Sequence, residues 1–226
     1  MNMAKISENP TILPEPTIRR LPWYLSYVRM LHNMQVEYVS STQISKELNV
    51  QSSQIAKDLS FLNIRGKTRI GYEVKSLMVV LEDFLGFNRR HDAVVIGTGS
   101  LGAALMKDRG LENYGLNIVA GFDVRSEVIG KDLGGLSVYD ISELADWQRE
   151  HHVPIAILTV PVESAQEVAD LVISCGMTAI WNFTPYRIKA PEHVVIANTS
   201  IYAHLAIIYN RMYNTMNPDK GDSSHR

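Results

Sequence analysis

The feature that most constrains the fold of this chain is a glycine-rich turn, Gly97-Thr98-Gly99-Ser100-Leu101-Gly102. It follows the apolar run 93–96, and the next apolar run, 118–122, ends at the acid Asp123. Strand, glycine turn, helix, strand and acid in this order are typical of a dinucleotide-binding unit, because the glycines let the backbone turn sharply and approach a pyrophosphate. The first N–H groups of the helix then face the phosphates. We therefore predict that these six residues bind a dinucleotide.

The acid at the end of the second strand predicts which dinucleotide binds. Asp123 lies 26 residues after Gly97, whereas the usual spacing is about 20, and a longer connection at 111–115 accounts for the difference. A carboxylate here accepts hydrogen bonds from the adenosine ribose and repels a 2′-phosphate, so we expect Asp123, with Val124 beside it, to favour NAD(H) over NADP(H). Arg125 could weaken this preference. The alternative interpretation is a structural glycine turn that binds nothing.

Apolar and helical patterns alternate along the second half of the chain. The strands are expected at 93–96, 118–122, 154–160, 178–183 and 194–196, and the helices at 100–107, 140–150, 163–175 and 201–213. This alternation predicts an α/β Rossmann-like domain over residues 91–199, with a parallel sheet and helices on both faces.

Two further segments stand at the ends of candidate strands. They are Thr159-Val160-Pro161 and Asn182-Phe183-Thr184-Pro185. Ligands of open parallel sheets lie beyond the carboxyl ends of the strands, so we predict that both segments meet the nicotinamide half of the cofactor. An apolar pocket there would disfavour the cationic ring of NAD⁺ more than the neutral ring of NADH. The alternative is that Pro161 and Pro185 only end their strands.

A different pattern precedes the Rossmann-like part. A short turn between two helices, followed by a basic segment with flanking glycines, Gly66–Tyr72, is typical of a winged helix-turn-helix domain. Residues 1–90 contain 12 basic and 8 acidic residues, a net charge of +4, which favours a nucleic-acid partner. We therefore predict a winged-helix DNA-binding domain over residues 17–90. Its helices are expected at 17–37, 42–48, 52–62 and 74–87, the second capped by Ser40 with Gln43 and the third by Ser52 or Ser53.

The DNA-binding residues are predicted on three segments. These are the first helix, the second helix of the helix-turn-helix (52–62, the recognition helix) and the basic segment Gly66–Tyr72, which we call the wing. The polar face of the recognition helix, which includes Lys57 and Asp58, is expected to stay free of the core. Basic side chains would bind phosphates or enter a groove. The predicted set is Arg19, Arg20, Ser52, Gln54, Lys57, Lys67, Arg69 and Tyr72. The alternative is a small helical interaction module whose cations are ordinary surface charges.

No catalytic set can be recognised in the sequence. His151 and His152 are adjacent and precede a candidate strand, and His204 lies in the last helix among Ile and Ala. No Ser-His-Asp set, metal-ligand spacing or carboxylate pair stands at a strand end. A cofactor site without a proton-transfer partner favours a sensor over an enzyme. Two alternatives stay open: an NAD-dependent oxidoreductase with an N-terminal helical domain, and a CoA- or nucleotide-binding Rossmann module without a DNA function.

Composition indicates the compartment. A single cysteine, Cys175, argues against an internal disulfide framework and a cysteine metal cluster. No apolar run reaches the roughly 18 residues that span a bilayer, and segment 1–15 lacks the apolar block of a secretion signal. We expect a cytoplasmic protein with no metal and no membrane partner. Residues 1–16 are predicted to form a flexible arm and residues 217–226 a disordered tail.

Several motifs together resemble the Rex family of redox-sensing transcriptional repressors. They are Arg19–Pro22, Ala56–Ser60, Gly66–Tyr72, Gly97–Gly102, Phe122–Val124, Ile157–Pro161, Ala165–Asp170 and Asn182–Pro185. The resemblance implies an α+β multidomain protein, with a winged domain before the Rossmann-like sheet. It also implies a homodimer whose last helix, 200–216, swaps across to the partner. Operator DNA binding would be permitted by NAD⁺ and released by NADH.

The chain departs from the family pattern at three places. Ala56 stands where a basic residue usually precedes the lysine, and Asp108 stands where an aromatic residue is common. The segment 198–202 lacks the aspartate often found where the last helix begins. The difference at Ala56 concerns contact with DNA, and the difference at Asp108 concerns a contact between the domains. The difference at 198–202 concerns the link between redox state and domain closure.

Overall fold

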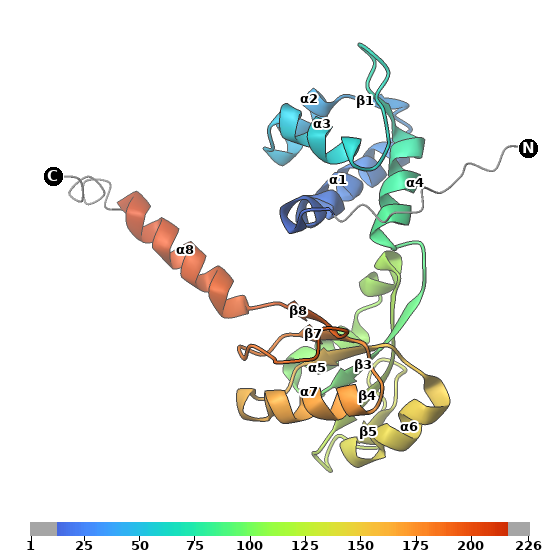
Figure 1. Cartoon of the computed structure of the whole chain (residues 1–226), viewed down its shortest axis with the longest axis vertical. Helices are drawn as coiled ribbons and strands as arrows, with labels where there is room; N and C mark the ends of the chain where they lie inside the picture. Colours follow the sequence, from blue (N-terminus) through green and yellow to red (C-terminus); the bar gives the residue numbers. More distant parts are fainter. Residues whose placement is uncertain (1–12, 217–226) are drawn as a thin grey trace, which may run out of the picture. The chain divides into compact units, whose positions relative to one another are not determined.

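The computed structural model describes residues 13–216 and divides the chain into two compact units, Met1–Arg89 and Arg90–Arg226 (Figure 1). The division lies beside the predicted boundary between residues 90 and 91. Most of the predicted arm and all of the predicted tail lie outside the described residues. The first helix begins at Glu15, inside the segment predicted as an arm, and Leu13 before it is buried.

The first unit is helical with one short pair of strands. Its elements are α1 (Glu15–Asn33), β1 (Tyr38–Val39), α2 (Ser41–Leu48), α3 (Ser52–Ser60), β2 (Tyr72–Glu73) and α4 (Val74–Leu85). Apolar side chains at helical spacing on α1, α3 and α4 are fully buried in one core, to which Leu25, Ile55 and Leu81 belong. The helix-turn-helix arrangement predicted from the sequence is therefore present as α2 and α3.

The helix termini agree with the prediction at α2 and differ at α3. Ser40 Oγ accepts from the Gln43 N–H at 3.1 Å, and Gln43 Oε1 accepts from the Ser40 N–H at 2.7 Å, which confirms the predicted capping box. The cap of α3 was predicted wrongly, because the N-cap residue is Gln51 and it makes no side-chain capping hydrogen bond. α1 also ends four residues earlier than predicted, since Gln35 adopts a left-handed conformation (φ 59°).

The wing is a tight loop closed by Lys67 and Gly71. The Lys67 N–H donates to the Gly71 carbonyl at 2.7 Å, and the Gly71 N–H donates to the Lys67 carbonyl at 2.9 Å. Arg69 at its tip has φ 64°. Gly71 has φ 109°, and a Cβ there would lie 2.4 Å from the Val39 carbonyl oxygen, so only glycine fits where the loop meets β1.

The second unit is a six-stranded parallel sheet. Its strands are β3 (His91–Ile96), β4 (Leu116–Asp123), β5 (Val138–Asp140), β6 (Ile155–Leu158), β7 (Ala179–Asn182) and β8 (Val195–Asn198), in the order β5-β4-β3-β6-β7-β8. The order reverses between β3 and β6, as in the doubly wound dinucleotide-binding fold. Five strands were predicted. The sixth, β5, was not predicted; it has only three residues and pairs at the sheet edge with Gly121–Asp123 of β4.

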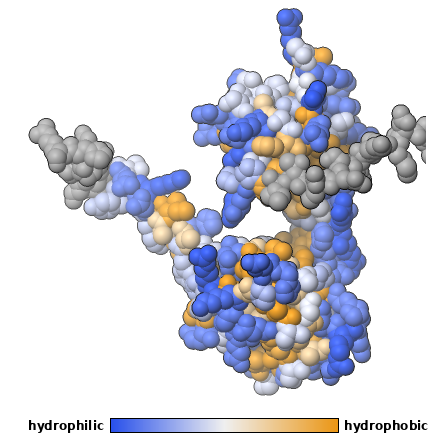
Figure 2. All heavy atoms as spheres, in the orientation of Figure 1, coloured by the Kyte–Doolittle hydropathy of each residue, from blue (hydrophilic) through white to orange (hydrophobic). Residues whose placement is uncertain are grey.

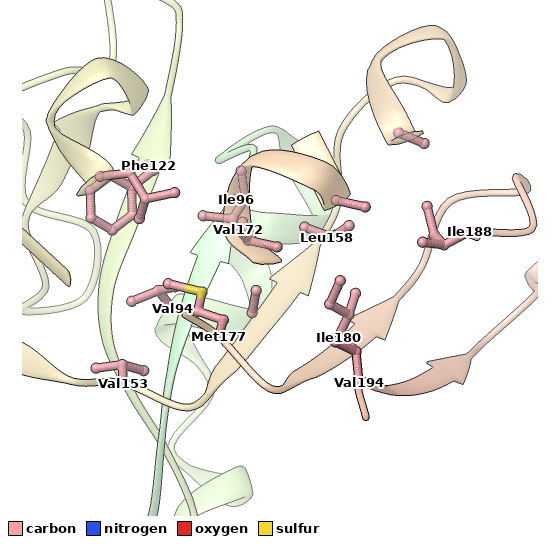
Figure 3. Close-up of a cluster of buried hydrophobic side chains, with 14 of the residues drawn as sticks. Val94, Ile96, Phe122, Val153, Leu158, Val172, Met177, Ile180, Ile188 and Val194 are labelled. Atoms are coloured by element: carbon pink, nitrogen blue, oxygen red, sulfur yellow. The ribbon is translucent and has the colours of Figure 1, made fainter. Parts of the chain in front are cut away.

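Helices cover both faces of the sheet, as predicted. α6 (Leu144–His151) and α7 (Ala165–Ser174) pack on one face, and α5 (Ser100–Lys107) packs on the other. Figure 3 shows buried side chains between the sheet and the helices α6 and α7, among them Ile96 of β3, Leu158 of β6 and Val172 of α7. β4 carries a bulge opposite Ala93 and Val94. The extra residue shifts the alternation, so Ile118 packs on the face that α5 covers, whereas Ala120 and Phe122 pack on the face that α6 and α7 cover.

The last helix, α8 (Ile201–Met216), agrees with the predicted helix over 201–213 and extends it. Every residue of α8 is exposed, and Figure 2 shows hydrophobic residues on part of its surface. The large exposed apolar side chains on it are Ile201, Tyr202, Leu205, Ile207, Ile208, Tyr209, Met212, Tyr213 and Met216. Within residues 13–216, no helix combines the length and hydropathy that a membrane span requires.

Candidate nucleotide cavity and DNA-facing surface

A cavity of about 680 Å³ lies at the carboxyl ends of β3, β4 and β6, where the strand order reverses. Ligands of open α/β sheets bind at this position. Residues from the glycine turn, from the end of β4 and from the start of α7 line it. The lining residues are Ile96, Gly97, Gly99, Phe122, Asp123, Val124, Arg125, Ile141, Thr159, Val160, Pro161, Ser164, Glu167, Val168 and Leu171.

The glycines of the turn are required by different contacts. Gly97 has φ 89°, and a Cβ there would lie 2.9 Å from Val160 Cγ1. A Cβ on Gly102 would lie 2.1 Å from the Gly97 carbonyl oxygen and 2.8 Å from Thr159 Oγ1. By contrast, a Cβ on Gly99 would meet no atom within 4 Å. Gly97 and Gly102 are therefore needed to build the turn, whereas Gly99 leaves open space beside the cavity.

The turn is tied to β6 and opens onto a helix start. Thr159 Oγ1 donates to the Gly97 carbonyl at 2.5 Å, which joins the end of β6 to the turn. Gly99 is the N-cap of α5 and offers no side chain to its first N–H groups. Such uncapped N–H groups, at the positive end of the helix dipole, suit a phosphate.

Asp123 is buried at the end of β4 and its carboxylate is surrounded by donors. Oδ2 accepts from the Thr98 N–H at 2.7 Å and from Thr98 Oγ1 at 2.9 Å. Oδ1 accepts from the Val124 N–H at 2.9 Å and from the Arg125 N–H at 3.0 Å. The Arg125 guanidinium adds two further hydrogen bonds. Burial raises the pKa of Asp123, but the hydrogen bonds from Arg125 and Thr98 outweigh it and hold the pKa well below its ordinary value.

The cavity brings together part of the predicted cofactor set. Gly97, Gly99, Asp123, Val124 and the segment 159–161 line it. Thr98 and Gly102 are buried within the turn and do not line the cavity. Ser100 and Leu101 lie in the first turn of α5, where they are exposed and also do not line the cavity. One face of α7 was not predicted: the N-cap residue Ser164 and the α7 residues Glu167, Val168 and Leu171 line the cavity at helical spacing.

The second predicted segment is not part of this cavity. Asn182 is fully buried, and its Nδ2 donates to the Tyr186 carbonyl at 2.7 Å and to Asn198 Oδ1 at 2.9 Å. Its Oδ1 accepts from the N–H and Oγ1 of Thr184. Phe183 contacts Trp181, with ring centroids 4.6 Å apart, and Pro185 is exposed. Asn182–Pro185 therefore forms a hydrogen-bonded turn after β7 and does not line this cavity with Thr159–Pro161, and its contact with the nicotinamide stays a prediction.

The predicted DNA-binding residues lie on α3, in the wing and on α1. Lys57 is exposed on α3, with Ser52 half-buried one and a half turns before it. Lys67, Arg69 and Tyr72 line a polar hollow of about 310 Å³ beside Ser40 and Ser41. Lys67 Nζ donates to the Tyr38 hydroxyl at 2.7 Å, and this hydrogen bond raises the pKa of Lys67.

The first half of α1 carries two adjacent arginines with different surroundings. Arg19 is exposed and pairs with Glu15 on the same helix, with 2.6 Å between Nη2 and Oε1. Arg20 instead pairs with Asp58 of α3, at 2.7 Å from Nε to Oδ2 and 2.8 Å from Nη2 to Oδ1. Arg20 thus holds α1 and α3 together, and its predicted phosphate contact has no support from this geometry.

Asp58 was predicted on the free face of α3, and this is wrong because its side chain is fully buried. It also accepts from Thr17 Oγ1 at 3.1 Å, the Tyr24 hydroxyl at 2.8 Å and Gln54 Nε2 at 2.9 Å. Burial raises the pKa of Asp58, but the hydrogen bonds from Arg20, Tyr24 and Gln54 outweigh it, and the pKa is lowered overall. Gln54, predicted to contact DNA, is thereby held by its amide N–H toward the core.

Histidines and acids do not gather into a metal site in this structure. In the described part of the chain, no group of three or more His, Cys, Asp or Glu residues could hold a metal ion. The His151 ring stacks on Trp147 with centroids 3.8 Å apart, and its Nδ1 lies 2.7 Å from the Trp147 carbonyl oxygen. This histidine closes the end of α6 and is not among the residues that line the cavity.

Two family models match the two units. One is described as "Putative DNA-binding protein N-terminus" and matches residues 12–60, and the other is described as "CoA binding domain" and matches residues 88–186. The first contains α1, α2 and α3, and the second contains the glycine turn and most of the cavity lining. The DNA-binding model thus lies within the first unit, and the CoA-binding model lies almost wholly within the second.

Similarity to known proteins extends over nearly the whole chain. The redox-sensing transcriptional repressor Rex of Bacteroides fragilis is 52% identical over 212 residues, which cover 94% of this chain and 96% of that protein. The protein of the same name from Porphyromonas gingivalis is 52% identical over 202 residues, which cover 89% and 93%.

Solved structures agree with these relatives. RSP, described as a Rex-family repressor, has been solved with β-NAD⁺ and operator DNA; that structure is 30% identical, has a TM-score of 0.87 and covers 95% of this chain and 100% of its own. RSP with β-NADH is 32% identical, with a TM-score of 0.83 and coverage of 93% and 99%. The chain therefore belongs to the Rex family of redox-sensing transcriptional repressors, as its motifs indicated.

Proposed function

We propose that this chain is a homodimeric repressor that binds NAD(H) in the cavity at the glycine turn and operator DNA through α3 and the wing, and that NADH releases it from DNA. The observation that carries the proposal is a dinucleotide-type cavity on the same chain as a winged helix-turn-helix unit. Full-length similarity to a repressor solved with β-NAD⁺ and operator DNA, and also with β-NADH, supports it.

The cavity residues divide into a polar end and an apolar end. The α5 N–H groups beside Gly99 would hold the pyrophosphate, and Asp123 and Arg125 would border the adenosine ribose. Val160 and Pro161 contribute apolar surface beyond the turn. Because an apolar wall disfavours a cationic ring more than a neutral one, this end would favour the reduced nicotinamide. A ligand shifts a conformational equilibrium only by its differential affinity for the two states, so this difference is the source of redox sensing.

We further propose that the cavity binds NAD(H) without catalysing a reaction on it. We also propose that the protein acts in the cytoplasm. Its ionisable lining residues, within residues 13–216, are Asp123, Arg125 and Glu167. Asp123 has a lowered pKa, which leaves it a poor proton donor near neutral pH. Steady consumption of NADH in a screen of small carbonyl substrates would instead favour the oxidoreductase alternative.

The function is tested by fluorescence anisotropy on a labelled palindromic duplex that the protein selects from a random pool. NADH and NAD⁺ are added to the complex at matched concentrations. We expect NADH to dissociate the complex and NAD⁺ to leave it bound. A complex that persists at saturating NADH would show that the cavity does not control DNA binding.

DNA affinity is expected to depend on Lys57, which is exposed on α3 and whose side chain makes no salt bridge or hydrogen bond within the described chain. Replacing it with alanine removes one cation that can neutralise a phosphate in each protomer. The slope of log K against log salt should therefore become shallower by about 1 for each phosphate that is no longer neutralised. Lys46→Ala on α2, which also removes an exposed lysine, is the matched control. An unchanged slope in Lys57→Ala would assign DNA binding to another surface.

Dimerisation is expected to depend on α8, because nine large apolar side chains on it are exposed in the single chain. A chain that ends at Thr199 should sediment as a monomer, whereas a chain that ends at Met216 should remain a dimer. Sedimentation equilibrium distinguishes the two. A stable dimer without residues 200–216 would place the subunit contact elsewhere.

A further inference from the structure

Lys67 of the wing is held by a tyrosine that lies 29 residues before it in the sequence. Lys67 Nζ donates to the Tyr38 hydroxyl at 2.7 Å and lies 4.8 Å from the centroid of the Tyr38 ring. Tyr38 is half-buried on β1, whereas Lys67 is exposed. One side chain therefore offers the ammonium both a hydrogen-bond acceptor and the electron-rich surface of a ring.

The backbone is fixed at both ends of this contact. Tyr38 pairs with Glu73 of β2 in the short antiparallel sheet. The Lys67 N–H donates to the Gly71 carbonyl, and the Lys67 carbonyl accepts from the N–H groups of Ile70 at 3.1 Å and Gly71 at 2.9 Å. The remaining freedom lies in the flexible four-carbon side chain of Lys67, and the contact with Tyr38 restricts it.

The ammonium group keeps donors for a ligand. It carries three N–H groups, and Tyr38 is its one hydrogen-bond partner within residues 13–216, so two N–H groups remain for another acceptor. Lys67 lines the polar hollow of the wing, whereas Tyr38 is not among the residues that line it. Tyr38 therefore acts on this hollow through Lys67.

The ammonium group also keeps its charge, although acids lie nearby. The hydrogen bond to Tyr38 raises the pKa of Lys67 most, and the charges of Glu73 and Glu37 raise it further. Neither carboxylate forms a salt bridge with Lys67 in the described part of the chain. Because the Tyr38 hydroxyl is a neutral acceptor, it holds the ammonium without cancelling the positive charge, which a carboxylate partner would do.

We propose that Tyr38 is a positioning residue for DNA binding, which holds the Lys67 ammonium in place for a phosphate of the DNA backbone and does not itself contact the DNA. This rests on the proposed function, since it concerns the wing as part of the DNA-binding surface. Lysine binds phosphate as a point charge with rotatable donors, so the location of its ammonium determines the strength of the contact. A side chain that is ordered beforehand also loses less conformational freedom on binding.

The test is a double-mutant cycle on the full chain, with anisotropy on the selected duplex in the absence of NADH. Tyr38→Phe removes the hydroxyl and keeps the ring, and it should weaken DNA binding by about 3- to 10-fold, the effect of one lost hydrogen bond. Lys67→Ala should itself weaken binding by about tenfold or more, because it removes a charged contact. With Lys67→Ala already present, Tyr38→Phe should change the affinity by less than about twofold, because no ammonium is left to position.

Tyr27→Phe is the matched control. Tyr27 is half-buried on α1 of the same unit, and its hydroxyl makes no hydrogen bond within the described residues. Its replacement should leave the affinity for the duplex unchanged, which excludes a general effect of removing a tyrosine hydroxyl from the first unit.

Three results would overturn this proposal and leave the proposed function intact. Unchanged affinity in Tyr38→Phe, with binding weakened in Lys67→Ala, would show that Lys67 reaches the DNA without the tyrosine. Equal losses from Tyr38→Phe with and without Lys67 would show that Tyr38 contacts the DNA itself or only supports β1. Unchanged affinity in Lys67→Ala would exclude this lysine from the DNA-binding surface. An unaltered protein that selects no duplex would instead overturn the proposed function as well.

Discussion

Replacing Asp58 with asparagine is expected to lower the free energy of unfolding of the first unit by about 3 kcal/mol or more, because a buried ion pair is left with one partner. Asparagine fills the same space, but its amide group brings donors toward Arg20 and Tyr24, which already donate. The Tyr24 hydroxyl is buried, so it cannot turn to water for a new partner. Hydrogen exchange of α1 and α3 peptides during urea titration measures the change in this unit alone.

Glu15→Gln is the matched control for Asp58→Asn. Glu15 also pairs with an arginine, but the side chains of Glu15 and Arg19 are 73% and 71% exposed. Exposed pairs contribute about 0–1 kcal/mol, so this change should leave the stability of the unit nearly unaltered. Equal effects of the two substitutions would contradict a central role for the buried pair.

The same network gives stability a pH dependence. The pKa of Asp58 is lower in the folded chain than in the unfolded chain, where an aspartate has a pKa of about 3.9. Its contribution is therefore complete above the unfolded value and disappears as pH falls through the lower folded value. The difference in unfolding free energy between the unaltered protein and Asp58→Asn should shrink in this acidic window. A difference that is independent of pH would show that the Asp58 charge is not what stabilises the unit.

Replacing Gly102 with alanine is expected to weaken NADH binding by more than about 100-fold, because the phosphate-binding turn cannot keep its shape. The added Cβ would lie 2.1 Å from the Gly97 carbonyl oxygen, so α5 must move away from the turn. Overpacking of this kind also costs about 1–3 kcal/mol of stability. Calorimetry with NADH and urea unfolding of the second unit measure the two effects.

Gly99→Ala separates ligand binding from folding. A Cβ at Gly99 meets no atom within 4 Å, and Gly99 has φ −64°, so alanine should fold without strain. The methyl group would nevertheless occupy space beside the cavity where the backbone is expected to approach a pyrophosphate. We expect nearly unchanged stability with NADH binding weakened by about tenfold or more. Undiminished NADH affinity in Gly99→Ala would place the phosphates away from this turn.

The sequence predicted the glycine turn between β3 and α5 well because its requirements are local. The requirements at Gly97 and Gly102 arise from contacts within the turn and with the end of β6, and a glycine pattern at fixed spacing records them directly. The strand order follows from the alternation of strands and helices and from the handedness of their connections. The short edge strand β5 was missed because three residues are too few to show a periodic pattern.

The wrong placement of Asp58 and the unforeseen hydrogen bonds of Asn182 have a common cause. Asp58 was placed on the free face of α3 because it is charged, yet its donors Thr17, Tyr24 and Arg20 lie 34 to 41 residues away in the sequence. Asn182 was predicted to meet the cofactor because it stands at the end of a strand, and the sequence did not reveal that its amide joins β7 to Asn198, 16 residues later. Hydrogen-bond partners this distant cannot be inferred from local pattern, and they determine whether a polar side chain supports the fold or faces a ligand.

We propose that occupancy of the cavity and occupancy of the DNA-binding surface are thermodynamically coupled. If NADH lowers the affinity for operator DNA by some factor, operator DNA must lower the affinity for NADH by the same factor. Calorimetric titration of NADH into the free protein, and into the protein saturated with its selected duplex, measures this factor directly. We expect weaker NADH binding to the DNA complex, by the factor found from anisotropy. Equal NADH affinity with and without DNA would contradict it.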